Sequence, residues 1–192
     1  MKIYYALKPT SLNQGFGKEH TAQALLATYQ SLGLSGHDGM DWSTVCKDDH
    51  IKTGGQCLPV YCDIDGYATI TFIQKDITYG SGIIALDQDG DHKHLWWHFD
   101  IINPDLKVGD RIEGGELLGI SGNTGISTGA HLHRGLYSFS EPYANGYHGA
   151  IDPTPFYSPI FILDYIQTLQ NKISILQKLI ALYTALKNLL KK

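Results

Sequence analysis

Residues 67–99 read YATITFIQKDITYGSGIIALDQDGDHKHLWWHF and contain three short runs rich in β-branched and aromatic residues. The runs cover residues 67–73, 82–86 and 95–99, with glycine-containing turns between them. The second and third runs flank Asp89-Gly90, a strong signal for a tight hairpin. Short strands joined in this way predict an antiparallel β-sheet or sandwich rather than a parallel α/β sheet.

The same strand-and-turn character extends over residues 51–158, and a short helix is expected around residues 20–32. We therefore predict one mainly β domain over residues 1–158. From residue 160 to the end there is no glycine or proline. Residues 159–192 are accordingly predicted to form a separate C-terminal amphipathic α-helix.

Apolar residues in this C-terminal segment recur at alternating steps of four and three, namely at Ile162, Ile166, Leu169, Ile173, Leu176, Ile180 and Tyr183. This is the spacing of a coiled coil. Three interpretations are open: the helix packs back on the domain, it lies on a membrane surface, or residues 160–192 form a coiled coil. A coiled coil would give a homo-oligomer or dock the chain to a partner such as a phage particle. Gln177, Lys178 and Lys187 exclude a membrane-spanning helix.

Composition narrows the possible partners and compartments. The 192 residues carry a formal net charge of −4, which argues against a nucleic-acid binder that relies on a basic surface. Lys8-Pro9 interrupts the first apolar run, so no secretory signal peptide is expected. The odd cysteine count leaves two alternatives. Either Cys46 and Cys57 form a disulfide, or all three cysteines are free thiols and Cys62 is buried.

The positions of the histidines give the clearest indication of a chemical function. His131 and His133 are two residues apart, so both side chains point to one face if the segment is a strand, and they supply half of a tetrahedral zinc site. His37 and Asp41 are separated by Gly39, which disfavours a helix. A turn that enters a strand could bring this imidazole and this carboxylate to the same point.

A third histidine segment covers residues 94–98. If it forms one continuous strand, His98 lies on the same face as His94 and Trp96.

Five segments together resemble the lysostaphin/LytM-type family of zinc metallopeptidases. They are NQGFG (13–17), GHDGMD (36–41), PVYCDIDG (59–66), VGDRI (108–112) and GISGNTGISTGAHLH (119–133). Members of this family cut peptide bonds in bacterial peptidoglycan, and their β-rich fold holds zinc in an open groove. The resemblance runs in order over about residues 13–153.

This resemblance implies roles for individual residues. His37, Asp41 and His133 match the zinc ligands, with one ion per chain. His98 and His131 match the catalytic histidines. Arg134 replaces a phenylalanine common in the family and is expected, with Tyr147, to lie beside the groove and contact substrate.

The sequence thus predicts a zinc-dependent endopeptidase that degrades the peptidoglycan of the bacterial cell wall. Without a signal peptide, such an enzyme would be delivered by a bacteriophage, carried on its virion as an endolysin-like component, or released by lysis. The alternative is a non-catalytic peptidoglycan-binding or phage-particle structural module on the same fold. All three implied ligands are present, which counts against that alternative.

Overall fold

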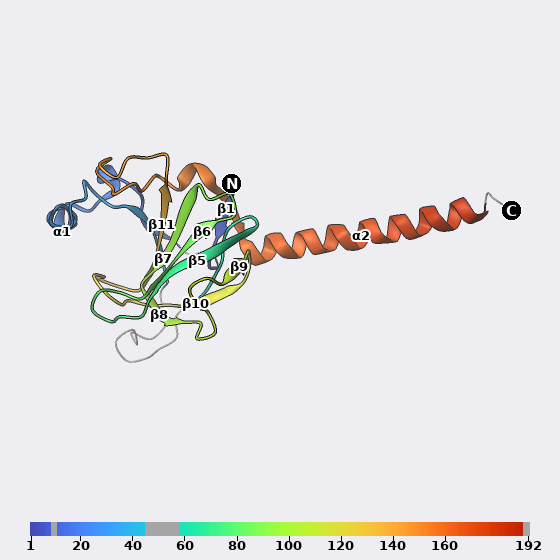
Figure 1. Ribbon diagram of the computed structural model, residues 1–192, viewed down its shortest axis with the longest axis horizontal. Coiled ribbons are helices and arrows are strands. Elements are labelled where there is room, and N and C mark those ends of the chain that lie inside the picture. Colours follow the sequence, from blue (N-terminus) through green and yellow to red (C-terminus); the bar gives the residue numbers. More distant parts are fainter. Residues whose placement is uncertain (9–10, 45–57, 190–192) are drawn as a thin grey trace.

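The computed structural model describes residues 1–8, 11–44 and 58–189, and most of its elements are β-strands (Figure 1). Among these residues the larger sheet has seven strands, all antiparallel. In spatial order they are β2 (Leu12–Gln14), β3 (Gly39–Ser43), β11 (His131–Ser138), β7 (His92–Trp97), β6 (Gly82–Asp87), β5 (Tyr67–Gln74) and β9 (Arg111–Glu113). The predicted fold class, mainly β with antiparallel sheets, is confirmed.

Two smaller sheets complete the β structure of the described residues. One is antiparallel and contains β4 (Pro59–Tyr61), β10 (Leu117–Ser121) and β8 (Phe99–Ile102). In the other, β1 (Ile3–Tyr5) and β12 (Tyr157–Phe161) pair in parallel. Side chains from the seven-stranded sheet and from the β4-β10-β8 sheet share one hydrophobic core, which includes Ile83, Trp96, Leu132, Val60, Phe99 and Leu118.

The three predicted strands are present, but the third is interrupted. The first two runs form β5 and β6, and Asp89-Gly90 lies in the turn that joins β6 to β7. The expected strand over residues 95–99 instead ends at Trp97, and β8 begins at Phe99. His98, between them, has a φ of 71°, a left-handed conformation that is uncommon for a residue with a side chain and breaks the strand.

The helix expected around residues 20–32 is shorter than predicted. Two 3₁₀ turns, η1 (Lys18–His20) and η2 (Gln23–Leu25), precede α1 (Leu26–Ser31). Gly33 follows the end of α1 with a φ of 78°, the left-handed conformation that commonly terminates helices. A further 3₁₀ turn, η4 (Thr154–Phe156), leads into β12.

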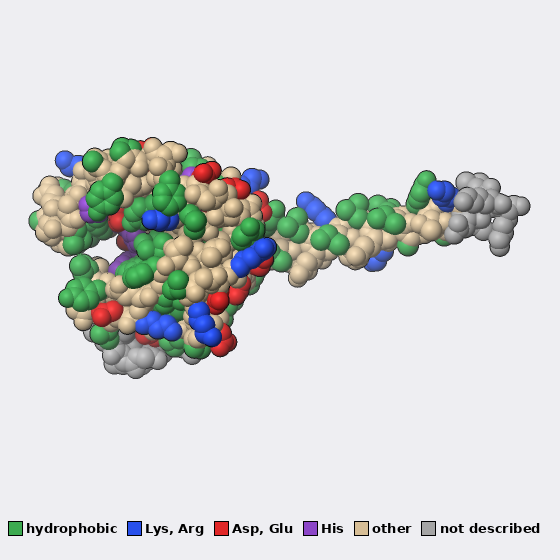
Figure 2. Space-filling view, in the orientation of Figure 1, with side chains coloured by type: hydrophobic (Ala, Val, Ile, Leu, Met, Phe, Trp, Pro, Cys, Tyr) green, Lys and Arg blue, Asp and Glu red, His purple; other side chains and the backbone are tan. Residues whose placement is uncertain are grey.

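The predicted C-terminal helix begins at Ile162 rather than at residue 159, because residues 159–161 extend β12 in its pairing with β1. This helix, α2 (Ile162–Leu189), projects away from the sheets (Figure 1). Its start is anchored, since Ile162 is 1% exposed and the ring of Tyr165 stacks on Tyr4 at 4.3 Å. Residues 167–187 are all exposed, and Figure 2 shows hydrophobic side chains along this part. The interpretation that the helix packs back on the domain is therefore wrong beyond its first turns.

Two further predictions concern the cysteines and membrane-spanning helices. Cys62 is a buried free thiol, whereas Cys46 and Cys57 lie outside the described residues. In the described part of the chain, no helix combines the length and the apolar character that crossing a bilayer requires.

Candidate metal centre

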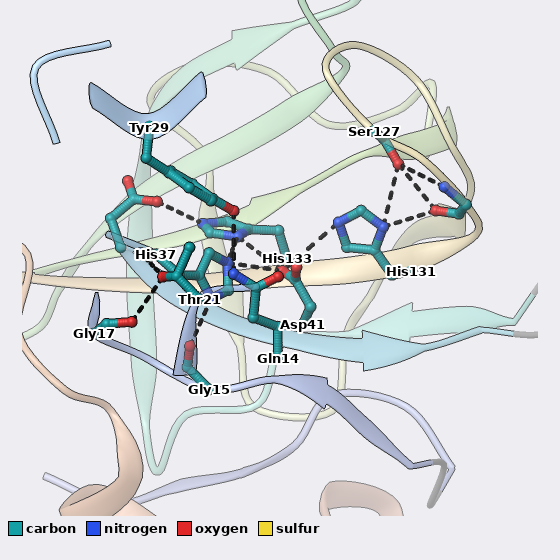
Figure 3. Close-up of polar contacts among 12 residues, drawn as sticks. Gln14, Gly15, Gly17, Thr21, Tyr29, His37, Asp41, Ser127, His131 and His133 are labelled. Atoms are coloured by element: carbon teal, nitrogen blue, oxygen red, sulfur yellow. Dashed lines mark hydrogen bonds and ion pairs between the residues drawn. The ribbon is translucent and has the colours of Figure 1, made fainter. Parts of the chain in front are cut away.

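The centre is built on two neighbouring strands of the larger sheet. β3 and β11 pair so that Asp41 lies opposite His133. Because side chains alternate along β11, His131 and His133 project from one face and Leu132 from the other. His37 precedes β3, and its backbone N–H donates to Thr21 Oγ1 at 2.8 Å, which holds the turn that carries it (Figure 3).

Three donor atoms converge in this region. His37 Nε2 lies 3.0 Å from His133 Nδ1 and 3.1 Å from Asp41 Oδ1, and the last two atoms are 3.0 Å apart. Ligands at about 2.0–2.1 Å from a tetrahedral zinc ion are separated by roughly 3.3 Å. The triangle formed by these three donor atoms is therefore close to the size that a single zinc ion needs, and the three residues can hold a metal ion.

The hydrogen bonds around the triangle also fit a cation. His37 Nδ1 donates to the Gly15 carbonyl at 2.8 Å, so a neutral His37 presents an unprotonated Nε2 to the centre. Burial acts to raise the pKa of Asp41, but hydrogen bonds with His133 and His37 outweigh it and hold the pKa below its ordinary value. An ionised carboxylate and a nitrogen lone pair that face each other at this distance favour a positive ion between them.

Two more histidines lie beside the triangle. The rings of His98 and His131 are 4.5 Å apart between centroids, and the His98 ring is 6.0 Å from that of His133. His131 Nδ1 donates to the Gly129 carbonyl at 2.7 Å, and His98 Nδ1 donates to the Thr124 carbonyl at 2.6 Å. Each neutral ring thus keeps an unprotonated Nε2.

Burial keeps both of these imidazoles neutral at physiological pH. It is the main cause that lowers the pKa of His98 to about 3, and the neighbouring His131 and His133 lower it further. Burial also lowers the pKa of His131, although Asp41 opposes the effect. Neutral rings with a fixed Nδ1–H can accept a proton at Nε2.

The position of His98 corrects the expectation from strand alternation. His94 and Trp96 are fully buried in the core, and a continuous strand would have placed His98 beside them. The left-handed backbone at His98 turns its ring toward His131 instead. The residue thereby lines the same cavity as His131 and His133.

The cavity in front of these histidines has a volume of about 640 Å³. Leu25, Tyr29 and Leu32, from η2, α1 and the end of α1, form part of its wall. Further lining side chains include Tyr79, Leu95, Trp97, Ile126 and Tyr137. Figure 2 shows histidine side chains inside the hollow that opens at the left of the molecule. The centre is therefore reachable by a ligand of peptide size.

Arg134 does not lie beside this cavity, so that expectation is wrong. It projects from the opposite face of β11 and is fully buried. Its Nε and Nη2 donate to the two carboxylate oxygens of Asp63 at 2.9 and 3.0 Å, and the guanidinium packs over the Trp96 ring. Period-two alternation is the reason, since neighbours on a strand point to opposite faces.

Tyr147 lies apart from the centre. Its ring packs against Phe16 at 4.7 Å between centroids, and its hydroxyl accepts a hydrogen bond from the Lys18 backbone N–H. It is not among the described residues that line the cavity. A substrate contact by Tyr147 stays a prediction.

Several lining residues were missed by the sequence analysis. Tyr137 is four residues beyond His133 on β11 and shares its face, so the alternation contained this signal. The Tyr137 hydroxyl donates to Asp38 at 2.9 Å, and Asp38 Oδ1 lies 3.8 Å from His133 Nε2. Tyr29, whose ring faces His37, comes from α1, and no local pattern indicated its position.

Comparison with known families and proteins is consistent with this geometry. The family described as Peptidase family M23 matches residues 35–146, more than half of the chain. Glycyl-glycine endopeptidase ALE-1 of Staphylococcus capitis is 42% identical over 82 residues, which are 41% of this chain and 20% of that protein. Lysostaphin of Staphylococcus simulans is 40% identical over 82 residues, 41% of this chain and 15% of its own length.

The chain thus spans a fifth or less of the length of these curated relatives. Among solved structures, lysostaphin from Staphylococcus simulans aligns with a TM-score of 0.57 and 24% identity, over 81% of this chain and 54% of the other. A structure of LytU aligns with a TM-score of 0.52 and 24% identity, over 78% and 85%. These likenesses show a shared fold.

Proposed function

This chain belongs to peptidase family M23, and we propose that it is a zinc-dependent endopeptidase that hydrolyses peptide bonds in bacterial peptidoglycan. The observation that carries the proposal is the convergence of three metal-binding side chains and two neutral histidines at one open cavity. The names of two relatives support it, since ALE-1 is a glycyl-glycine endopeptidase and lysostaphin has been described as an antimicrobial peptidase. Delivery by a phage particle or by lysis stays a prediction.

We assign the metal site to His37, Asp41 and His133, with one zinc ion per chain. Two imidazoles and a carboxylate are a ligand set that catalytic zinc sites use, and three protein ligands leave a fourth position for a reactant. When bound, zinc supplies Lewis-acid chemistry that polarises a carbonyl and acidifies water. The peptidase unit that carries this site is proposed to cover residues 1–158 together with the remainder of β12 to Phe161, so that the helical appendage begins at Ile162 rather than at residue 159.

His98 and His131 are the proposed catalytic residues. Each holds an Nε2 free to accept a proton, because the Nδ1 proton is donated to a backbone carbonyl. An imidazole that has taken a proton from water becomes a donor at the same atom. It can then hydrogen-bond to the developing oxyanion or return the proton to the departing amine nitrogen. The pair therefore moves protons without a further acid.

The proposal is tested by metal content and by clearing of a peptidoglycan suspension. Purified protein should contain about one zinc per chain, and a chelator should abolish clearing until zinc is restored. His131→Ala should keep the zinc and lose roughly 10²- to 10⁴-fold in activity, because it removes a proton carrier. His133→Ala should lose both zinc and activity.

His92→Ala is the matched control, since His92 lies at the far end of β7 and contacts Asp87. It should keep both properties. A wild-type protein that binds peptidoglycan but holds no metal and clears nothing would contradict the proposal and favour a binding module. Digestion of defined muropeptides, followed by mass measurement of the fragments, identifies the bond that is cut.

A further inference from the structure

The exposed part of α2 is an unpartnered surface. Only the beginning of the helix is anchored to the domain, and residues 167–187 are exposed on every side in the described structure. Helices in water gain most of their stability from packing of an apolar face rather than from intrinsic propensity. A projecting helix with this composition therefore indicates a partner.

The apolar pattern of α2 matches a two-stranded coiled coil. In heptad notation the a positions hold Ile166, which packs against Gly115 of the domain, and the exposed Ile173 and Ile180. The d positions hold Leu169, Leu176 and Tyr183. Isoleucine at a with leucine at d is the combination that favours two strands over three or four. The pattern thus predicts that the partner is a second α-helix with the same apolar repeat.

The exposed apolar area of α2 is larger than the apolar patches found on most monomers. Exposure ranges from 38% at Leu169 to 66% at Tyr183 among nine side chains: Leu169, Ile173, Ile175, Leu176, Leu179, Ile180, Leu182, Tyr183 and Leu186. At on the order of 100 Å² each, they expose roughly 900 Å². The five a and d side chains contribute roughly 500 Å² of this, and the flanking c and g positions (Ile175, Leu179, Leu182 and Leu186) contribute the rest. Single apolar patches on monomers rarely exceed about 600 Å², so an exposed apolar surface of this size indicates one that a partner covers.

The opposite face of α2 argues for a protein partner rather than a lipid surface. Between residues 173 and 186 the sequence contains one charged residue, Lys178. The remaining polar positions are uncharged, for example Ser174, Gln177 and Thr184. A helix that lies on a membrane pairs its apolar face with a strongly charged one, which is missing over this part of α2.

We propose that α2 is a self-association element: its a and d stripe docks on the same stripe of a second copy of this chain as a two-stranded coiled coil. The dimer carries two cavities. If the proposed function holds, both cavities bind the same polymeric substrate. Once one cavity is occupied, binding at the other is intramolecular, so the dimer binds the polymer more tightly than a single cavity does.

The experiment measures molar mass of the full chain by sedimentation equilibrium over a range of concentrations. Wild-type protein should form dimers. Ile173→Lys with Ile180→Lys should raise the dissociation constant by more than about 100-fold, because two buried apolar contacts are lost. Circular dichroism checks that helix content survives. Ser174→Lys with Ala181→Lys adds the same charge one residue further on, on the polar face, and should still dimerise.

Several outcomes would overturn this proposal. They are a wild-type monomer at every soluble concentration, an assembly larger than two chains, or dimers that persist in the Ile173 and Ile180 double variant. Flotation of a monomeric wild type with anionic phospholipid vesicles would assign the stripe to membranes instead. Zinc content is measured on the same samples, so a failure of the proposed function is distinguished from a failure of dimerisation.

Discussion

Among single residues, Gly39 lies between His37 and Asp41 at a position where the neighbouring strand leaves no room for a side chain. A Cβ atom at this position would lie 2.7 Å from His133 Cε1 and 2.8 Å from the Arg134 carbonyl oxygen. Neither distance is tolerated by real side chains, and the carbonyl belongs to the backbone of β11. Gly39 therefore lets β11 bring the His133 ring close enough to meet His37 and Asp41.

Replacing Gly39 by alanine should displace the His133 ring and weaken the metal site. We expect Gly39→Ala to lower zinc affinity by roughly 10- to 100-fold, the range seen when ligand orientation is disturbed. Competition with a chromophoric chelator measures this affinity. Gly129→Ala is the control for zinc binding, because a Cβ there meets nothing within 4 Å. Equal zinc affinities of Gly39→Ala and wild type would contradict the assigned role.

Among the elements, β11 serves two purposes through its two faces. His131 and His133 face the cavity, whereas Leu132, Arg134 and Leu136 are buried on the other side. The ion pair between Arg134 and Asp63 ties β11 to the segment that joins β4 and β5. Both partners are fully buried, so each depends on the other for compensation of its charge.

Breaking this pair should destabilise the fold strongly. Arg134→Met leaves Asp63 buried without its counter-charge, and we expect the free energy of unfolding to fall by about 3–5 kcal/mol. Urea denaturation monitored by tryptophan fluorescence measures it. The double variant Arg134→Met with Asp63→Leu should recover most of the loss, because no uncompensated charge remains. A stable single variant would show that the pair contributes little.

In the whole molecule, the start of α2 belongs to the domain and the rest does not. Ile162 is almost fully buried, and Tyr165 stacks on Tyr4. Gly115 approaches Ile166 so closely that a Cβ would lie 2.3 Å from its Cδ1. These contacts fix the direction in which the exposed part of the helix leaves the sheets (Figure 1).

Two truncated chains test this division. A chain that ends at residue 168 keeps the anchoring contacts, whereas a chain that ends at residue 161 keeps all of β12 and loses Ile162 and Tyr165. We expect the shorter chain to be less stable by about 2–4 kcal/mol, the range for removal of a large buried side chain. Thermal or urea unfolding compares them, and neither contains the exposed stripe, so dimerisation does not confound the result. Equal stabilities would contradict the anchoring role.

Local sequence patterns were sufficient for much of the architecture. The β-branched runs and Asp89-Gly90 predicted the antiparallel strands and a hairpin, because period-two alternation and turn chemistry act over a few residues. The absence of glycine and proline after residue 159 likewise predicted α2. The two histidines of β11 share a face for the same local reason.

Other features depended on contacts between distant segments. His37 and His133 are 96 residues apart, and only the pairing of β3 with β11 brings their rings together. The left-handed backbone at His98 reverses the face that alternation assigned to it. The contribution of α1 to the cavity wall and the pairing of Arg134 with Asp63 also depend on how distant segments pack together. Periodicity specifies the face of an element, whereas the element it meets and the backbone angle at a single residue are set by the assembled core.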